Sequence, residues 1–88
     1  MLINSNWHTV ITAGQDLNDL TDIGVYDCVS AATAQSLLNC PVSTNFVMQV
    51  YRKGNYQTQM ILMGSSIYAR TRGSSGWASW YKFTGTEE

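Results

Sequence analysis

The sequence holds few of the residues from which catalytic and metal sites are built. Its 88 residues include one histidine, His8, two cysteines and one proline, and only 12% of them are charged. Acid–base and nucleophilic mechanisms need a base beside a nucleophile, and His8 lies in the start of the chain, which is expected to be weakly ordered. The seven glycines lack the spacing of a phosphate-binding loop. We therefore expect no catalytic residue, no metal site and no cofactor.

The carboxylates Asp16, Asp19 and Asp22 follow one another at intervals of three residues. They lie beside a single expected helical turn that runs from Asp16 to Leu20, where an aspartate ordinarily caps the turn. The alternative is a carboxylate pair of the kind that hydrolyses glycosides, and the sequence favours capping. This supports the expectation of a protein without enzymatic activity.

Charge of one sign and long apolar runs are also lacking. The formal net charge is -1, which gives no general attraction to nucleic acid or to an anionic membrane surface. No apolar run approaches the roughly 18 residues of a membrane span, and the start has no signal-peptide pattern. We expect no nucleic-acid partner and no membrane insertion. The basic residues gather in the second half of the chain, where they form either a solvated rim or a ligand-facing strip. They are Arg52, Lys53, Arg70, Arg72 and Lys82.

The two cysteines, Cys28 and Cys40, are too few for a disulfide framework. Neither belongs to a CxxC or a cysteine–histidine ligand pattern. Free, buried thiols are the expected state, because an unpaired cysteine behaves as a small hydrophobic residue. A bridge between the two has no support in the sequence.

What the sequence does contain is a long β-forming region, from Phe46 to Phe83. Short turns that each contain glycine separate four runs rich in β-branched, aromatic and methionine residues: FVMQVYR, YQTQMILM, SIYARTR and WASWYKF. Connections this short join antiparallel neighbours, since a parallel crossover needs about a dozen residues. We therefore predict a four-stranded antiparallel meander over 46–83.

The first half of the chain is predicted to pack on this sheet. Trp7–Ile11 and Val25–Val29 have strand patterns, and Ser30–Leu38 has the composition of a short helix capped by its serine. An Asn39–Pro41 corner ends the helix, because a residue before proline avoids the helical region. The predicted fold class is α+β, a small, mainly antiparallel sheet with one short helix packed on it.

We expect a single domain over 1–88, in which residues 1–12 are a loosely ordered remnant of a longer chain. Alternation in the third long strand places Tyr68, Arg70 and Arg72 on one face, which is predicted to be wet, and Ile67 on the other. Trp80 and Phe83 are expected to fill the core. Other residues predicted to be largely buried are Leu17, Leu20, Leu37, Leu38, Met48, Val50 and Ile61.

Six short motifs in order resemble the pyocin-knob module, which is found in tail fibres of bacteriophages and of phage-tail-like bacteriocins. They are Asp16-Leu17-Asn18 with Leu20, Gly24-x-Tyr26, Asn39-x-Pro41, Gln59, Ile67-Tyr68-x-Arg70 and Trp77-x-x-Trp80. The resemblance implies a non-enzymatic virion part, usually trimeric, near the end of a fibre that contacts the host surface. The location it implies is the virion tail, or a prophage-encoded particle made in the bacterial cytoplasm. It brings no known set of binding residues.

Two functions follow for such a module, and the sequence leaves both open. In the first, aromatic rings beside amide and guanidinium donors recognise a bacterial surface glycan. Tyr68, Arg70, Arg72 and Trp77 are the predicted ligand-binding residues, because the third strand shows a polar face and Trp77 follows it across a glycine-rich turn. In the second, the domain is a structural trimerisation or spacer unit, and recognition lies elsewhere in the fibre.

Overall fold

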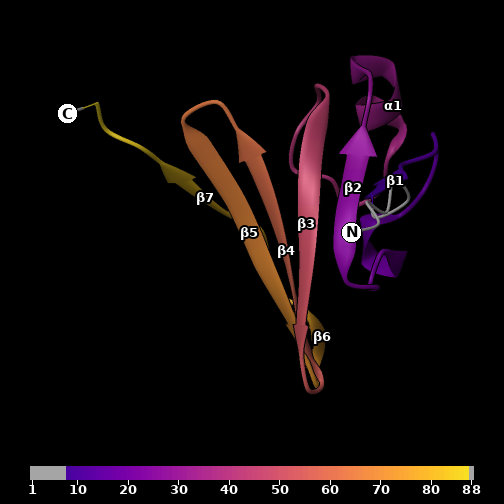
Figure 1. Cartoon of the computed structure of the whole chain (residues 1–88), viewed down its shortest axis with the longest axis vertical. Helices are drawn as coiled ribbons and strands as arrows, with labels where there is room; N and C mark the ends of the chain where they lie inside the picture. Colours follow the sequence, from indigo (N-terminus) through magenta and orange to yellow (C-terminus); the bar gives the residue numbers. More distant parts are fainter. Residues whose placement is uncertain (1–7, 88) are drawn as a thin grey trace, which may run out of the picture.

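The chain folds into one twisted sheet with a thin layer of loops and a short helix against one of its faces (Figure 1). The computed structural model describes residues 8–87. In chain order the elements are β1 (His8–Val10), the 3-10 turn η1 (Leu17–Asp19), β2 (Gly24–Cys28), α1 (Ala31–Ser36), β3 (Phe46–Lys53), β4 (Tyr56–Met63), β5 (Ser66–Gly73), β6 (Gly76–Trp77) and β7 (Tyr81–Thr84). The part of the expected remnant that covers residues 1–7, including Trp7 of the predicted first strand, lies outside the described residues.

The sheet is larger than the predicted four strands, and the α+β class with a mainly antiparallel sheet is confirmed. Its order is β1-β2-β3-β4-β5-β6, and β7 also pairs with β5. The hairpins from β3 to β5 are antiparallel, as expected, with left-handed glycines in their turns, Gly54 at φ 60° and Gly64 at φ 58°. β1 pairs with β2 in parallel, because the segment 11–23 between them is long enough for a crossover.

The predicted fourth strand is split in two by a β-bulge. Arg72 of β5 pairs with Trp77, and Ala69 pairs with Tyr81. Two residues, 70 and 71, thus lie opposite three residues, 78 to 80, which leaves one extra residue on the outer strand. Residues three apart in a regular strand point to opposite faces. The bulge therefore turns Trp80 to the same face of the sheet as Trp77.

The core lies between the sheet and the covering layer, and most of the residues predicted for it are there. Buried residues include Leu17, Leu37, Met48, Val50 and Ile61, and Leu20 and Trp80 pack partly buried against them. The helix begins as expected, since the Ser30 Oγ accepts a hydrogen bond from the Thr33 backbone N–H at 3.1 Å.

The prediction of a buried position is wrong for two residues. Leu38 is 57% exposed, because α1 ends at Ser36 and the extended backbone of Leu37 turns that side chain inward and the next one outward. Phe83 is 58% exposed, because β7 places it on the uncovered face of the sheet, opposite Ile67.

The faces of β5 are also the reverse of the prediction. Arg70, expected in solvent, is only 5% exposed under the covering layer, whereas Ile67 lies on the uncovered face. Alternation separated the two faces correctly. Alternation alone does not show which face is covered, and a guanidinium ordinarily indicates the solvent side.

Candidate functional site

Arg70 lies at the centre of the covered face, between two tryptophans. Its guanidinium carbon is 4.3 Å from the ring centroid of Trp77 and 4.6 Å from that of Trp80. Its Nε donates to the Gln59 Oε1 at 2.9 Å. Burial lowers the pKa of the Arg70 guanidinium, and the negative charge of Asp16 opposes this shift. Within residues 8–87 no carboxylate forms an ion pair with Arg70, so the indole rings and the amide stabilise its charge.

Gln59 connects this stack to the covering layer. It is fully buried, and its Nε2 donates to two backbone carbonyls of the β1–β2 crossover, Leu17 O at 2.6 Å and Leu20 O at 3.1 Å. Gln57 repeats the arrangement one step along β4, since its Nε2 donates to Thr21 O at 3.1 Å and its Oε1 accepts from Arg72 Nη1 at 3.1 Å. Polar side chains of the sheet therefore hold the crossover in place.

The two indole N–H groups make the same kind of contact. Trp77 Nε1 donates to Asn18 O at 3.2 Å, and Trp80 Nε1 donates to Asn39 O at 2.9 Å. Asp16 joins the two segments, because its Oδ1 accepts from the Asn18 backbone N–H and from Asn39 Nδ2, both at 2.8 Å. These contacts also lower the pKa of Asp16. Five of the six motifs that resemble the knob module, all except Gly24-x-Tyr26, thus contribute a residue to one structural network.

The four predicted ligand-binding residues share one face but not one environment. Arg70 is buried, Trp77 is half-buried against it, and Arg72 is exposed beside Gln57. Tyr68 lies on the other side of the stack, half-buried, with the Lys82 Nζ 5.7 Å from its ring centroid. The structure therefore brings Arg70, Arg72 and Trp77 together and separates Tyr68 from them.

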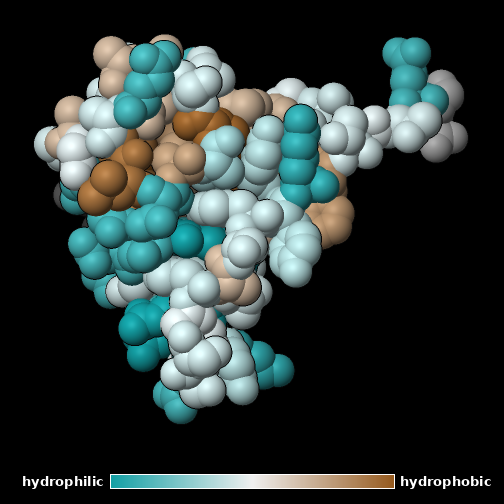
Figure 2. All heavy atoms as spheres, turned by 180° about the vertical axis from the view of Figure 1, so that it is seen from behind, coloured by the Kyte–Doolittle hydropathy of each residue, from teal (hydrophilic) through white to brown (hydrophobic). Residues whose placement is uncertain are grey.

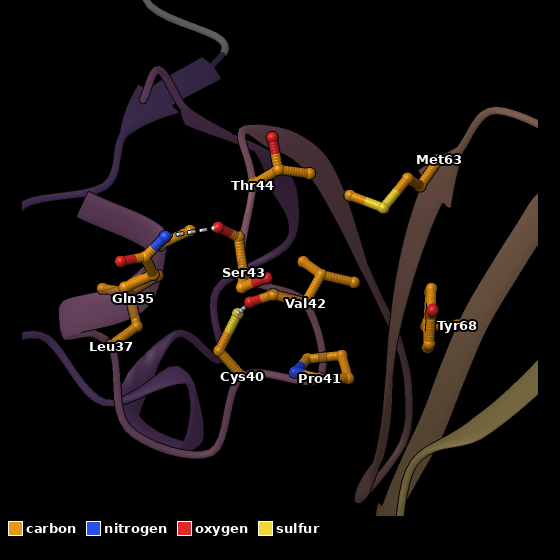
Figure 3. Close-up of a pocket in the computed structure, with 10 residues that line it drawn as sticks. Gln35, Leu37, Cys40, Pro41, Val42, Ser43, Thr44, Met63 and Tyr68 are labelled. Carbon is orange, nitrogen blue, oxygen red and sulfur yellow. Dashed lines mark hydrogen bonds between the residues drawn. The ribbon is translucent and has the colours of Figure 1, made fainter. Parts of the chain in front are cut away.

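Tyr68 borders a groove of about 490 Å³. In Figure 3, Tyr68 and Met63 lie on one side of this groove, and Pro41, Val42 and Thr44 lie on the other. The remaining residues around it are Ala34, Gln35, Leu37, Cys40 and Ser43. Apart from the Asn39–Pro41 corner, no sequence signal predicts that 40–44 lines this groove, because 40–44 is far from Tyr68 along the chain.

The opposite face of the sheet is uncovered and carries two rows of uncharged residues from β3 to β7. The first row, by strand register, is Val47, Leu62, Ile67 and Phe83, which are 37% to 58% exposed. The second is Gln49, Met60, Ala69 and Tyr81. Seen from behind, the tip formed by the β3–β4 and β5–β6 turns is neutral to hydrophilic, and the largest hydrophobic areas lie toward the other end (Figure 2).

Both cysteines are free, as expected; Cys28 is buried and Cys40 half-buried. Burial raises the pKa of each thiol, and it also raises the pKa of the Tyr26 phenol. A group whose pKa is higher in the folded state than in the unfolded state contributes its full stabilisation at pH values below its unfolded-state pKa. That pKa is about 8.5 for a thiol and 10 for a phenol. That stabilisation is lost as the pH rises further.

We therefore expect the urea midpoint to hold steady between about pH 7 and 8 and to fall toward about pH 10. The Cys28→Ala and Cys40→Ala variants should each show a shallower fall, because one ionising group is gone. A midpoint that rises with pH over this range would contradict the assignment.

Among residues 8–87 there is no group of three or more histidine, cysteine, aspartate or glutamate side chains placed to hold a metal ion. No helix in the same residues is long and apolar enough to cross a membrane.

Solved structures similar to this chain include tail fibres. No family model and no curated protein sequence matches the chain. Among solved structures, an N-truncated R2-type pyocin tail fibre has a TM-score of 0.80 and 25% identity, over 88% of this chain and 32% of that one. A C-terminal fragment of the R2 pyocin fibre of P. aeruginosa gives the same score and identity, over 88% of this chain and 22% of its own.

A C-terminal fragment of the R1 pyocin fibre of P. aeruginosa shares the fold at a TM-score of 0.80, with 22% identity over 88% of this chain and 21% of its own. The fold is thus that of a tail-fibre domain. The chain is similar to a domain of the R1 and R2 pyocin fibres, which confirms the resemblance of its sequence to the pyocin-knob module. It spans between about a fifth and a third of the fragments it matches.

Proposed function

We propose that this tail-fibre domain contributes to attachment by binding a glycan on the bacterial surface, without enzymatic activity. It acts in a tail-associated, virion-like particle, as part of a longer fibre. The observation that carries the proposal is the groove beside Tyr68, an open, aromatic-bordered surface on a domain similar to pyocin tail-fibre domains. Aromatic rings next to amide donors suit the apolar faces and the hydroxyls of sugars.

The predicted residues take different roles in this proposal. Tyr68 is the contact residue, and the exposed Arg72 and the half-buried Trp77 extend the same face. Arg70 touches no ligand, because it is 5% exposed, and it positions the indole rings. Asp16 is held as a cap by two hydrogen bonds, which supports a domain that binds glycan without cleaving it.

The proposed assembly is a homotrimer within the fibre. An open groove gives a weak single site, and linking copies raises the apparent affinity by about 10²–10⁴-fold where all can engage at once. We therefore expect the complete fibre to adsorb to host cells and the single 88-residue chain to adsorb poorly.

Adsorption of fluorescently labelled fibre, measured by flow cytometry, tests this. Surface polysaccharide extracted from the same host should compete with the fibre and be recovered at unchanged chain length. Polysaccharide from a strain that the fibre does not adsorb to is the control. Adsorption that no extracted polysaccharide reduces would contradict glycan recognition, and shortened polysaccharide would contradict a non-enzymatic role.

A structural role is the second candidate, and the uncovered face of the sheet favours it. The row of Val47, Leu62, Ile67 and Phe83 leaves apolar side chains in solvent, and neither it nor the next row carries a charge. Exposed, contiguous apolar surface of this kind usually marks an interface. In a trimer this face would lie against the other copies.

If this face is the trimer contact, the Ile67→Asp variant should sediment with the mass of one copy in place of three. The reason is that a carboxylate placed in an apolar interface loses its hydration. Thr71→Asp is the matched control, since Thr71 is exposed on the same strand and face but outside both rows. Its mass should stay that of the trimer. A trimer that survives Ile67→Asp would exclude this face as the contact.

A further inference from the structure

The groove beside Tyr68 has a built wall. Gln35 of α1 donates from Nε2 to Ser43 O at 3.2 Å, and the Cys40 thiol donates to Val42 O at 3.2 Å. The indole of Trp80 holds the base of this segment through Asn39 O. Helix, thiol and sheet therefore fix the strip 39–43 in front of Tyr68, and a ligand meets a groove that is already formed.

The chemistry of the lining limits the ligand. None of the ten residues around the groove is charged. One aromatic ring, Tyr68, stands on the sheet side, and the exposed hydroxyls of Ser43 and Thr44 stand on the other. A volume of about 490 Å³ falls within the range of small-molecule sites, roughly 300–1,000 Å³. This combination fits a ligand with one apolar face, several hydroxyls and no charge.

We propose that the groove is the primary subsite for an uncharged pyranose residue of the glycan. The apolar face of the sugar ring stacks on Tyr68, and its hydroxyls bond to Ser43 and Thr44. This assignment rests on the proposed function, and it makes the Arg72 end of the face peripheral. Lys82 lies near the Tyr68 ring but outside the lining residues, and its charge has no role in holding the sugar.

An NMR titration of the ¹⁵N-labelled 88-residue chain tests the assignment. The probes are methyl α-D-glucopyranoside, methyl α-D-galactopyranoside, N-acetylglucosamine and L-rhamnose, with glucuronate as the charged probe. We expect at least one neutral sugar to shift the amides of 42–44 and of Tyr68, with a Kd on the order of 1 mM. Binding should not change with salt, since no charge is paired.

Three variants separate the site from the fold. Tyr68→Ala should weaken binding at least about tenfold, because the ring on which the sugar stacks is removed. Tyr68→Phe should keep the binding, because the ring remains. Tyr56→Ala is the matched control, since Tyr56 is an exposed tyrosine on the opposite face of the sheet and its loss should change nothing. Lys82→Gln should also bind as the parent chain does.

Three outcomes would overturn the inference. The first is that the amide shifts map outside the groove. The second is that only glucuronate binds and that its binding is lost in Lys82→Gln. The third is that no neutral sugar causes a shift at a concentration about a hundredfold above a millimolar Kd. Should Tyr68→Ala fail to fold, the mapped shifts and the Tyr68→Phe variant still decide. None of these outcomes touches the competition between polysaccharide and complete fibre, so the proposed function stands or falls separately.

Discussion

The Arg70→Ala variant is expected to melt roughly 10–20 °C below the parent chain, a loss of about 2–4 kcal/mol in a domain of this size. Two cation–π contacts contribute about 0.5–2 kcal/mol each when they are desolvated. The hydrogen bond from Nε to Gln59 adds about 1.5–3 kcal/mol because its donor is charged. The desolvation of the buried guanidinium offsets part of this sum.

Two further variants show whether the stack itself is responsible. Arg70→Lys keeps the charge but loses the planar group that lies between two rings, so it should recover less than half of the lost stability. Arg72→Ala removes an exposed arginine with one hydrogen bond to Gln57, and it should cost about 1 kcal/mol or less. Equal unfolding midpoints for Arg70→Ala and Arg72→Ala would show that the stack is not a major source of stability.

The Gln59→Leu variant is expected to lose about 2–4 kcal/mol, although it makes the core more apolar. Leucine fills a similar volume but cannot replace the amide, so Leu20 O and Arg70 Nε lose their partner, and Leu17 O keeps only the hydrogen bond from the Leu20 backbone N–H. Each buried polar group left unpaired costs about 1–3 kcal/mol. Hydrogen exchange in the crossover should also become faster, because the sheet no longer holds η1.

Gln49→Leu is the matched control, because Gln49 lies on the uncovered face of the neighbouring strand. The same substitution there should change stability by no more than about 0.5 kcal/mol. Urea unfolding of both variants measures the difference. A midpoint for Gln59→Leu at or above that of the parent chain would mean that water satisfies the carbonyls and that the amide is dispensable.

Much of the sheet could be predicted from the sequence because its signals are local. Alternating residues and glycine turns define β3, β4 and β5 within two residues, and Ser30 and Pro41 bracket the helix. The class and the antiparallel meander follow from those signals. The parallel pairing of β1 with β2 does not follow from the sequence, because a connection as long as 11–23 allows either orientation.

The side of the sheet that is covered could not be predicted, because it depends on contacts far apart in the chain. The sequence pattern predicts that Arg70 lies at the surface. In the structure Trp77 and Trp80 enclose it, and both rings face it only because the bulge turns Trp80 to the same side. Phe83 reads as core until β7 is seen on the open face. Nothing in a period of two distinguishes these cases.

The candidate site was predicted in part for the same reason. The polar face of β5 includes both Tyr68, which borders the groove, and Arg70, which is buried. The strand pattern alone does not distinguish the two. The wall at 40–44 is joined to Tyr68 only by the packing of the covering layer. A site formed by two distant segments has no contiguous signal in a single sequence.

Adsorption of the complete fibre carrying Tyr68→Ala tests the central claim most directly, with Tyr56→Ala as its control. Trp77 is unsuited to this test, because its indole also holds Asn18 O and stacks on Arg70. We predict that Tyr68→Ala lowers adsorption to host cells at least about tenfold, amplified by multivalency, while melting temperature and trimer mass match those of Tyr56→Ala. Unchanged adsorption, or loss of the trimer in place of binding, would contradict recognition at Tyr68 and leave this domain a structural part of the fibre.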